Sequence, residues 1–221
     1  MRRVFLSIMA CVLAGNAYAG LITHNNYTLD TDTNIVTGGG LEWLQWDETL
    51  GLSINDVTDP NGSYAQAGWS VVNEQQMAAL FNDWAFGPTG YVWGTDETVT
   101  QGISVFGATL PDVPSYLFTE LFGATFTSSS GATNLRAIYG SDMNQNGLFV
   151  QASMFTSSGN PFPYGTVQLL EENSSISASY SAPSIAVAMV RDSSSVEVPE
   201  PGSLALMMIA LGGLGLRRRI R

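Results

Sequence analysis

The chain has 221 residues and a formal net charge of −11, contains no lysine, and carries six of its eight arginines near its two ends. Residues 20–197 hold 18 acidic and 2 basic residues, a formal charge of −16. This excludes nucleic acid and anionic lipid as partners of that segment, because phosphate groups are bound by clustered cations. The same segment has no cysteine and a single histidine, which excludes disulfides and a zinc or other transition-metal site.

The first nineteen residues have the three parts of a secretory signal peptide. Two arginines precede an apolar stretch at residues 4–13, and the small residues Ala17 and Ala19 flank Tyr18 at the cleavage position. We therefore expect signal peptidase to remove residues 1–19 and to leave a mature chain that begins near Gly20.

The next part of the chain predicts short strands separated by turns. Residues 21–29 are rich in β-branched side chains and predict a first strand, while three consecutive glycines at 38–40 predict a break. Residues 41–46 predict an aromatic strand or a buried corner, and residues 53–57 predict a short helix.

Two helices are predicted in the middle of the chain. Asn73 is placed to cap a helix over residues 73–84, with Gln76 as its reciprocal partner. Its apolar stripe consists of Met77, Leu80, Phe81 and Trp84. A second helix is predicted over residues 115–122, where a proline precedes it and a glycine follows it.

The remaining chain predicts strands, and it ends in a linker. The expected strands are residues 135–139, 147–155, 165–170, 175–180 and 184–190. Three consecutive serines begin a linker at residues 193–197. The prediction is thus a single exported α+β domain over residues 20–192, with irregular antiparallel β-sheets and one or two short helices.

Three short segments of this domain resemble a C-type-lectin-like module found in exported bacterial proteins. They are Asp32-Thr33 followed by Gly40-Leu41-Glu42-Trp43, then Gly68-Trp69-Ser70 followed by Glu74 and Phe81, and finally Ala188-Met189-Val190-Arg191. Residues 34–39 interrupt the first segment, and Val71-Val72-Asn73 replaces the usual core of the second. The resemblance implies a C-type-lectin-like fold, and such a fold carries many unrelated functions.

The last 24 residues, 198–221, form a three-part segment. Pro199, Glu200 and Pro201 hold an extended stretch open, residues 204–216 are apolar, and five residues from 217 onward include four arginines. About 13 residues give a helix of about 20 Å, which is short against a hydrocarbon core of about 30 Å. The terminal arginines favour the cytoplasmic side, so the segment predicts a transient membrane anchor.

This tail resembles the PEP-CTERM sorting signal in the order of its three parts. The matching residues are Pro199, Glu200, Pro201, the apolar run at 204–216, Arg217, Arg218 and Arg219. The resemblance implies recognition by a membrane-embedded exosortase and removal of the tail. It also implies delivery to the cell surface, the extracellular matrix or the medium of a Gram-negative bacterium, in many cases one that makes exopolysaccharide.

One loop has the composition of a calcium site. Asp142, Asn144 and Asn146 alternate and are followed by Gly147, which matches the first half of a calcium-binding loop. Ser153 stands where the full helix-loop-helix motif needs a bidentate glutamate, so that motif is rejected. Two interpretations remain: a looser calcium site, the one cofactor that the pattern allows, and an Asn-Gly turn between strands.

Catalytic side chains are scarce, and the predicted function is a non-catalytic one. His24 has no serine nucleophile motif with it, whereas Glu42 and Asp47 flank Trp43 and Trp46 in a composition typical of sugar sites. The sequence predicts an exported adhesive or glycan-binding module, with exopolysaccharide as its partner. An exported hydrolase that uses carboxylates and a purely structural matrix protein are the alternatives.

Overall fold

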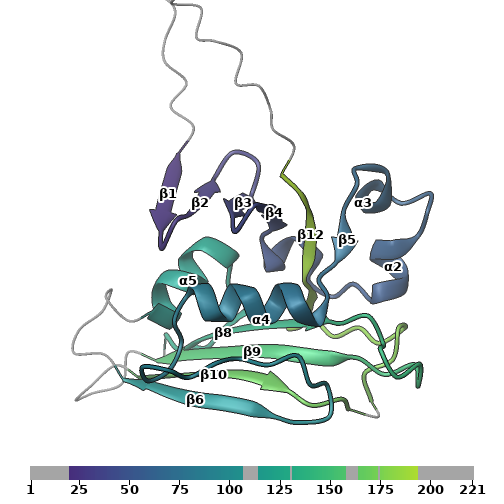
Figure 1. Cartoon of the computed structure of the whole chain (residues 1–221). Coiled ribbons are helices and arrows are strands. Elements are labelled where there is room, and N and C mark those ends of the chain that lie inside the picture. Colours follow the sequence, from purple (N-terminus) through teal and green to yellow (C-terminus); the bar gives the residue numbers. More distant parts are fainter. Residues whose placement is uncertain (1–19, 107–113, 130, 158–163, 174, 194–221) are drawn as a thin grey trace, which may run out of the picture. The chain divides into compact units, whose positions relative to one another are not determined.

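The computed structural model describes residues 20–106, 114–129, 131–157, 164–173 and 175–193. Contacts divide the chain into one unit at Met1–Arg191 and another at Asp192–Arg221. In the first unit, two β-sheets enclose two helices (Figure 1). The predicted signal peptide, linker and sorting tail lie outside the described residues, apart from Ser193.

The first sheet, sheet A, is built mainly from the start of the chain. Its strands are β1 (Leu21–His24), β2 (Tyr27–Asp30), β3 (Ile35–Gly38), β4 (Leu41–Leu44), β5 (Ser70–Val71) and β12 (Met189–Asp192), in the order β1-β2-β3-β4-β12-β5. The predicted single strand at 21–29 is wrong, because Asn25 and Asn26 adopt positive φ angles of 51° and 65°. Two such residues form the tight turn of a hairpin, which joins β1 to β2 in antiparallel register.

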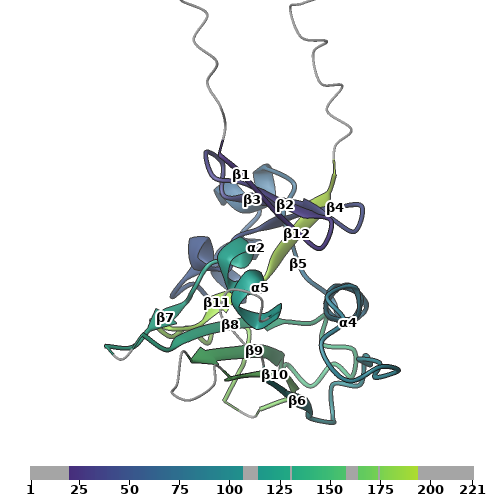
Figure 2. The ribbon, with the colours of Figure 1, turned by 90° about the vertical axis from the view of Figure 1, so that its left-hand side faces the viewer.

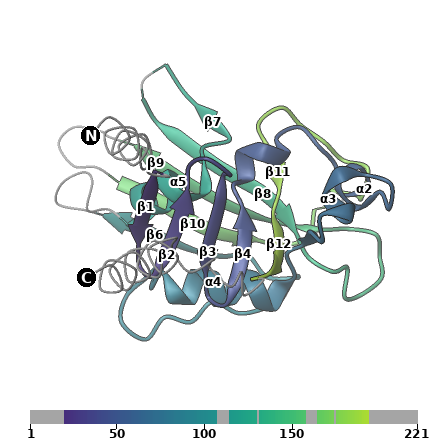
Figure 3. The ribbon, with the colours of Figure 1, turned by 90° about the horizontal axis from the view of Figure 1, so that it is seen from above.

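The second sheet, sheet B, comes from the later part of the chain. Its strands are β6 (Gln101–Phe106), β7 (Phe126–Thr127), β8 (Thr133–Tyr139), β9 (Val150–Ser157), β10 (Tyr164–Leu170) and β11 (Ala186–Val187), in the order β11-β8-β9-β10-β6 with β7 on β8. The pairing of β11 with β8 is parallel, which departs from the predicted antiparallel arrangement. Seen from above, the strands of sheet A cross those of sheet B (Figure 3).

Ala188 links the two sheets and explains a second difference from prediction. The predicted strand at 184–190 is two short strands, because the chain leaves sheet B after β11 and enters sheet A at β12. The Ala188 N–H donates to the Ile138 carbonyl in sheet B, whereas its carbonyl accepts from the Val72 N–H. The predicted strand at 175–180 is absent, and the described residues of this stretch make a single isolated bridge, between Ser177 and Leu148.

The two predicted helices are present, and shorter ones accompany them. Helix α4 spans Glu74–Asp83 with the predicted capping box of Asn73 and Gln76, and α5 spans Pro114–Phe122. The other helical elements are η1 (Trp46–Thr49), α2 (Ile54–Thr58) and α3 (Ser63–Gln66). The structure consists mainly of antiparallel sheets with a few short helices, which is consistent with an α+β or a mostly β class, and it has more helical elements than the one or two expected. No helix among the described residues is long and apolar enough to cross a membrane.

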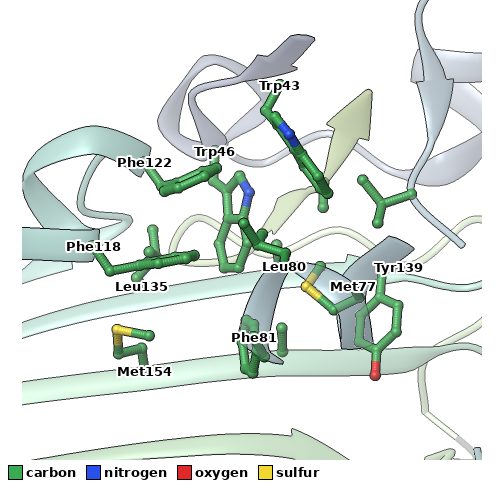
Figure 4. Packing of buried hydrophobic residues seen from close by; sticks show 14 of the residues in the cluster. Trp43, Trp46, Met77, Leu80, Phe81, Phe118, Phe122, Leu135, Tyr139 and Met154 are labelled. Carbon is green, nitrogen blue, oxygen red and sulfur yellow. The ribbon is translucent and has the colours of Figure 1, made fainter. Parts of the chain in front are cut away.

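The helices α4 and α5 lie between the two sheets, and the main core forms around them (Figure 2). Sheet A contributes Tyr27, Leu29, Val36 and Trp43; the helices contribute Met77, Leu80, Phe81, Phe118, Leu121 and Phe122; sheet B contributes Leu135, Ala137, Val150, Ala152, Met154, Val167 and Leu169. Phe118 and Phe122 are stacked at 4.2 Å, and Trp46 meets both rings at about 6 Å (Figure 4). Aromatic packing between the layers thus stabilises a domain that has no cysteine with which to form disulfides.

Candidate functional site

The predicted calcium loop follows strand β8, and helix α4 holds it in place. Glu74, the first residue of α4, is only 2% exposed, and its two carboxylate oxygens accept from Ser141 N–H and Ser141 Oγ at 2.8 Å each. The positive end of the helix stabilises this carboxylate. Gly140 has a φ of 112°, and a Cβ there would lie 2.9 Å from Glu74 Oε1, so this position requires glycine.

The three predicted ligands lie on one turn of this loop. Asp142 Oδ2 accepts from Gly147 N–H at 3.0 Å, Asn144 Oδ1 from Asn146 N–H at 3.1 Å, and Asn146 Oδ1 from Leu148 N–H at 2.8 Å. Asp142 Oδ1 is buried and has no hydrogen-bond partner in the described part of the chain. The loop is therefore closed by its own side chains, with one carboxylate oxygen left over.

Two glutamates from other parts of the chain complete the cluster. Asn144 Nδ2 and Asn146 Nδ2 donate to the two oxygens of Glu172 at 2.6 and 2.7 Å. Glu97 is 7% exposed, and its Oε1 accepts from Asn144 N–H at 3.1 Å. Burial raises the pKa of Glu97, and the neighbouring carboxyl group of Glu172 raises this pKa further.

The donor set of this cluster consists of oxygens, which is what calcium requires. Within the described ranges, no three His, Cys, Asp or Glu side chains are arranged to hold a metal ion, so the amide oxygens of Asn144 and Asn146 would have to take part. Calcium binding by Asp142, Asn144 and Asn146 stays a prediction. Glu97 and Glu172 do not belong to the sequence motif, since they lie 47 and 28 residues from Asn144, and no local pattern points to them.

We expect the Glu97–Glu172 pair to make stability fall as pH rises. The pKa of Glu97 is raised above its ordinary value of 4.5, so the folded state holds this proton more tightly than the unfolded state does. The resulting stabilisation is complete below the unfolded pKa and is lost as pH rises through the folded one. In urea titrations from about pH 4 to about pH 8, Glu97→Gln should lose less stability than the unmodified protein.

The exposed neighbour Glu171 provides the matched control for that measurement. Glu171→Gln should follow the unmodified protein at every pH, and a Glu97→Gln curve that does the same would contradict the assignment.

Calcium should raise the melting temperature of the unmodified protein at neutral pH and should not do so in Asp142→Asn. If calcium leaves the melting temperature unchanged, the calcium prediction is wrong.

The other residues considered for catalysis form ion pairs or lie in the core. His24 Nε2 and Glu120 Oε2 are paired at 3.0 Å on the surface. Glu42 Oε2 accepts from Arg191 Nε at 2.6 Å. Trp43 and Trp46 are each 1% exposed and belong to the main core. The combination of acids and tryptophans that is typical of a sugar site therefore does not form one, because both rings face inward.

Comparison with known proteins identifies the end of the chain. Residues 197–219 match the PEP-CTERM protein-sorting motif, which includes the predicted residues from Pro199 to Arg219. The motif implies processing by an exosortase and export to the cell surface or the extracellular space. No curated protein and no solved structure matches the chain. The C-type-lectin-like resemblance of the mature domain thus finds no support in these comparisons.

Proposed function

We propose that the domain over residues 20–192 is a non-catalytic module that binds glycan or mediates adhesion outside the cell. The sorting motif at residues 197–219 carries this proposal, because export to the cell surface or extracellular space would bring the domain into contact with extracellular glycans. In this proposal signal peptidase removes residues 1–19. The apolar run at 204–216 enters the inner membrane transiently until an exosortase removes it.

The side chains best placed for catalysis support a binding role rather than a hydrolytic one. Glu42, which precedes Trp43, is 9% exposed and is neutralised by Arg191. A retaining or inverting glycosidase needs two carboxyl groups facing a shared substrate cleft, one of which keeps its proton. Burial and the neighbouring Glu172 raise the pKa of Glu97, but the amides of Asn144 and Asn146 occupy Glu172.

The test is co-sedimentation of the exported protein with exopolysaccharide purified from the producing organism, combined with an assay for new reducing ends. Binding without new reducing ends supports the proposed module. Reducing ends that disappear in Glu97→Gln would support the carboxylate-dependent hydrolase instead. If the protein neither binds nor cleaves, it acts as a purely structural matrix component. Neutral dextran serves as the control polymer for non-specific retention.

A further inference from the structure

A cavity of about 200 Å³ opens at one end of sheet B, away from the calcium loop. Its described lining consists of Phe126 from β7, Asn134 and Arg136 from β8, and Ser184 from the segment before β11. Asn134 and Arg136 share one face of β8, because alternate side chains of a strand point the same way. The residue between them, Leu135, is fully buried in the main core, so the cavity lies on the opposite, outer face.

Arg136 brings an uncompensated positive charge to this cavity. Its side chain is exposed and makes no ion pair or hydrogen bond with any residue that the structure describes, and its backbone N–H donates to Thr125 Oγ1. The other arginine of residues 20–197, Arg191, is committed to Glu42 and lies 4.3 Å from the ring of Trp69. A guanidinium with no acidic partner among the described residues, in a segment with a formal charge of −16, marks a local site for an anion.

The remaining lining groups define what kind of anion fits. A guanidinium fork matches a carboxylate in a two-pronged contact. Asn134 offers an amide and Ser184 a hydroxyl, which can bond ring hydroxyl groups. The Phe126 side chain, 49% exposed, presents an apolar ring to the C–H face of a sugar. The volume is below the 300 Å³ or so of pockets for drug-sized ligands, so it matches a single ring.

The outer face next to the cavity gives a longer chain a surface to follow. The strand register places Ser153 opposite Arg136, and Gln168 opposite Ser153 on the next strand. Two residues along the strands, Asn134 and Thr166 lie on either side of Phe155 on β9. The side chains of Ser153, Gln168, Asn134 and Thr166 are partly exposed, polar and uncharged, and Phe155 is partly exposed and aromatic. A polymer with its acidic unit at Arg136 would therefore continue over polar groups and one aromatic ring and would meet no carboxylate among them.

From these observations we infer that the cavity lined by Phe126, Asn134, Arg136 and Ser184 binds a carboxylate-bearing sugar, a hexuronate unit of an acidic polysaccharide. The inference rests on the proposed function, since it names the ligand class of the same exported module. In the bound state the Arg136 guanidinium pairs with the carboxylate, the Phe126 ring covers one face of the sugar, and Asn134 and Ser184 hold its hydroxyl groups.

The test is calorimetric titration of the full chain in mild detergent with galacturonate, galactose and acetate as separate probes. Galacturonate should bind more tightly than either galactose or acetate, because only galacturonate offers both the ring and the charge. Arg136→Gln should weaken galacturonate binding by about tenfold or more, as expected for loss of a charge-assisted pair. Phe126→Ala should weaken galacturonate binding and leave acetate binding unchanged.

Gln75→Glu is the matched control, because it changes the net charge by the same amount at an exposed site on α4 that does not line the cavity. It should bind galacturonate as the unmodified protein does. Equal affinities for galacturonate and galactose, equal affinities for galacturonate and acetate, or an unchanged affinity in Arg136→Gln would each overturn the inference. If Arg136→Gln still co-sediments fully with exopolysaccharide, the cavity is not the binding site, while the proposed binding function stands. If the unmodified protein does not co-sediment, the proposed function itself fails.

Discussion

Replacing Phe122 by alanine is expected to destabilise the folded domain by about 3–5 kcal/mol, the largest loss that we predict for a single substitution. Phe122 is fully buried, stacks on Phe118 at 4.2 Å, and meets the rings of Tyr27 and Trp43 from sheet A. Removing this ring would leave a cavity in the layer between the sheets. Because no disulfide can form in residues 20–197, nothing covalent offsets the loss.

The measurement is the free energy of unfolding from urea titrations followed by tryptophan fluorescence. Tyr116 lies on the same helix with 39% of its surface exposed, so Tyr116→Ala is the matched control and should change stability by no more than about 0.5 kcal/mol. A loss below about 1 kcal/mol for Phe122→Ala, or equal losses for the two variants, would show that α5 does not join the sheets as described.

Replacing Glu74 by alanine should cost about 2 kcal/mol and should loosen the calcium loop. The change removes a buried carboxylate that accepts two hydrogen bonds from Ser141, at the end of α4 where a negative charge is favoured. The Ser141 N–H loses its partner, so its amide should exchange with solvent faster than in the unmodified protein. Glu74→Gln keeps an acceptor oxygen and should lose less stability than Glu74→Ala.

The neighbouring exposed residue Gln75 separates the effect of the carboxylate from that of the helix. Gln75→Ala alters the same turn of α4 without touching the loop, and it should leave both stability and Ser141 exchange nearly unchanged. Unchanged exchange of Ser141 in Glu74→Ala would mean that α4 does not position residues 141–147.

The elements that the sequence predicted well are those with local signals. Helix α4 has a reciprocal cap and an apolar stripe, both between Asn73 and Trp84, and it formed as expected. The hairpin at Asn25 and Asn26 was missed because two asparagines are a weaker turn signal than Asn-Gly. The break at Ala188 depends on partners in both sheets, and no local pattern encodes it.

The residues of the candidate sites also differ in whether a local sequence pattern predicts them. Asp142, Asn144 and Asn146 belong to one short motif and lie together, whereas Glu97 and Glu172 join them only through the fold. For Trp43 and Trp46 the sequence pattern suggested a sugar site that the structure does not form. Aromatic residues next to acids occur both in sugar sites and in protein cores, and these two rings are buried. No sequence motif surrounds Arg136, which is only notable as one of two arginines in residues 20–197. Phe126 comes close to it through the fold, because the pairing of β7 with β8 sets Phe126 opposite Asn134, two residues from Arg136.

All of these proposals place the domain outside the cell, and the sorting motif at residues 197–219 is the reason for doing so. The most direct test is mass spectrometry of the native protein from membrane, matrix and medium fractions. We expect the matrix and medium to contain a chain that begins near Gly20 and lacks the apolar run at 204–216. A mature product in those fractions that still carries residues 204–221 would contradict exosortase processing and remove the basis for an extracellular role.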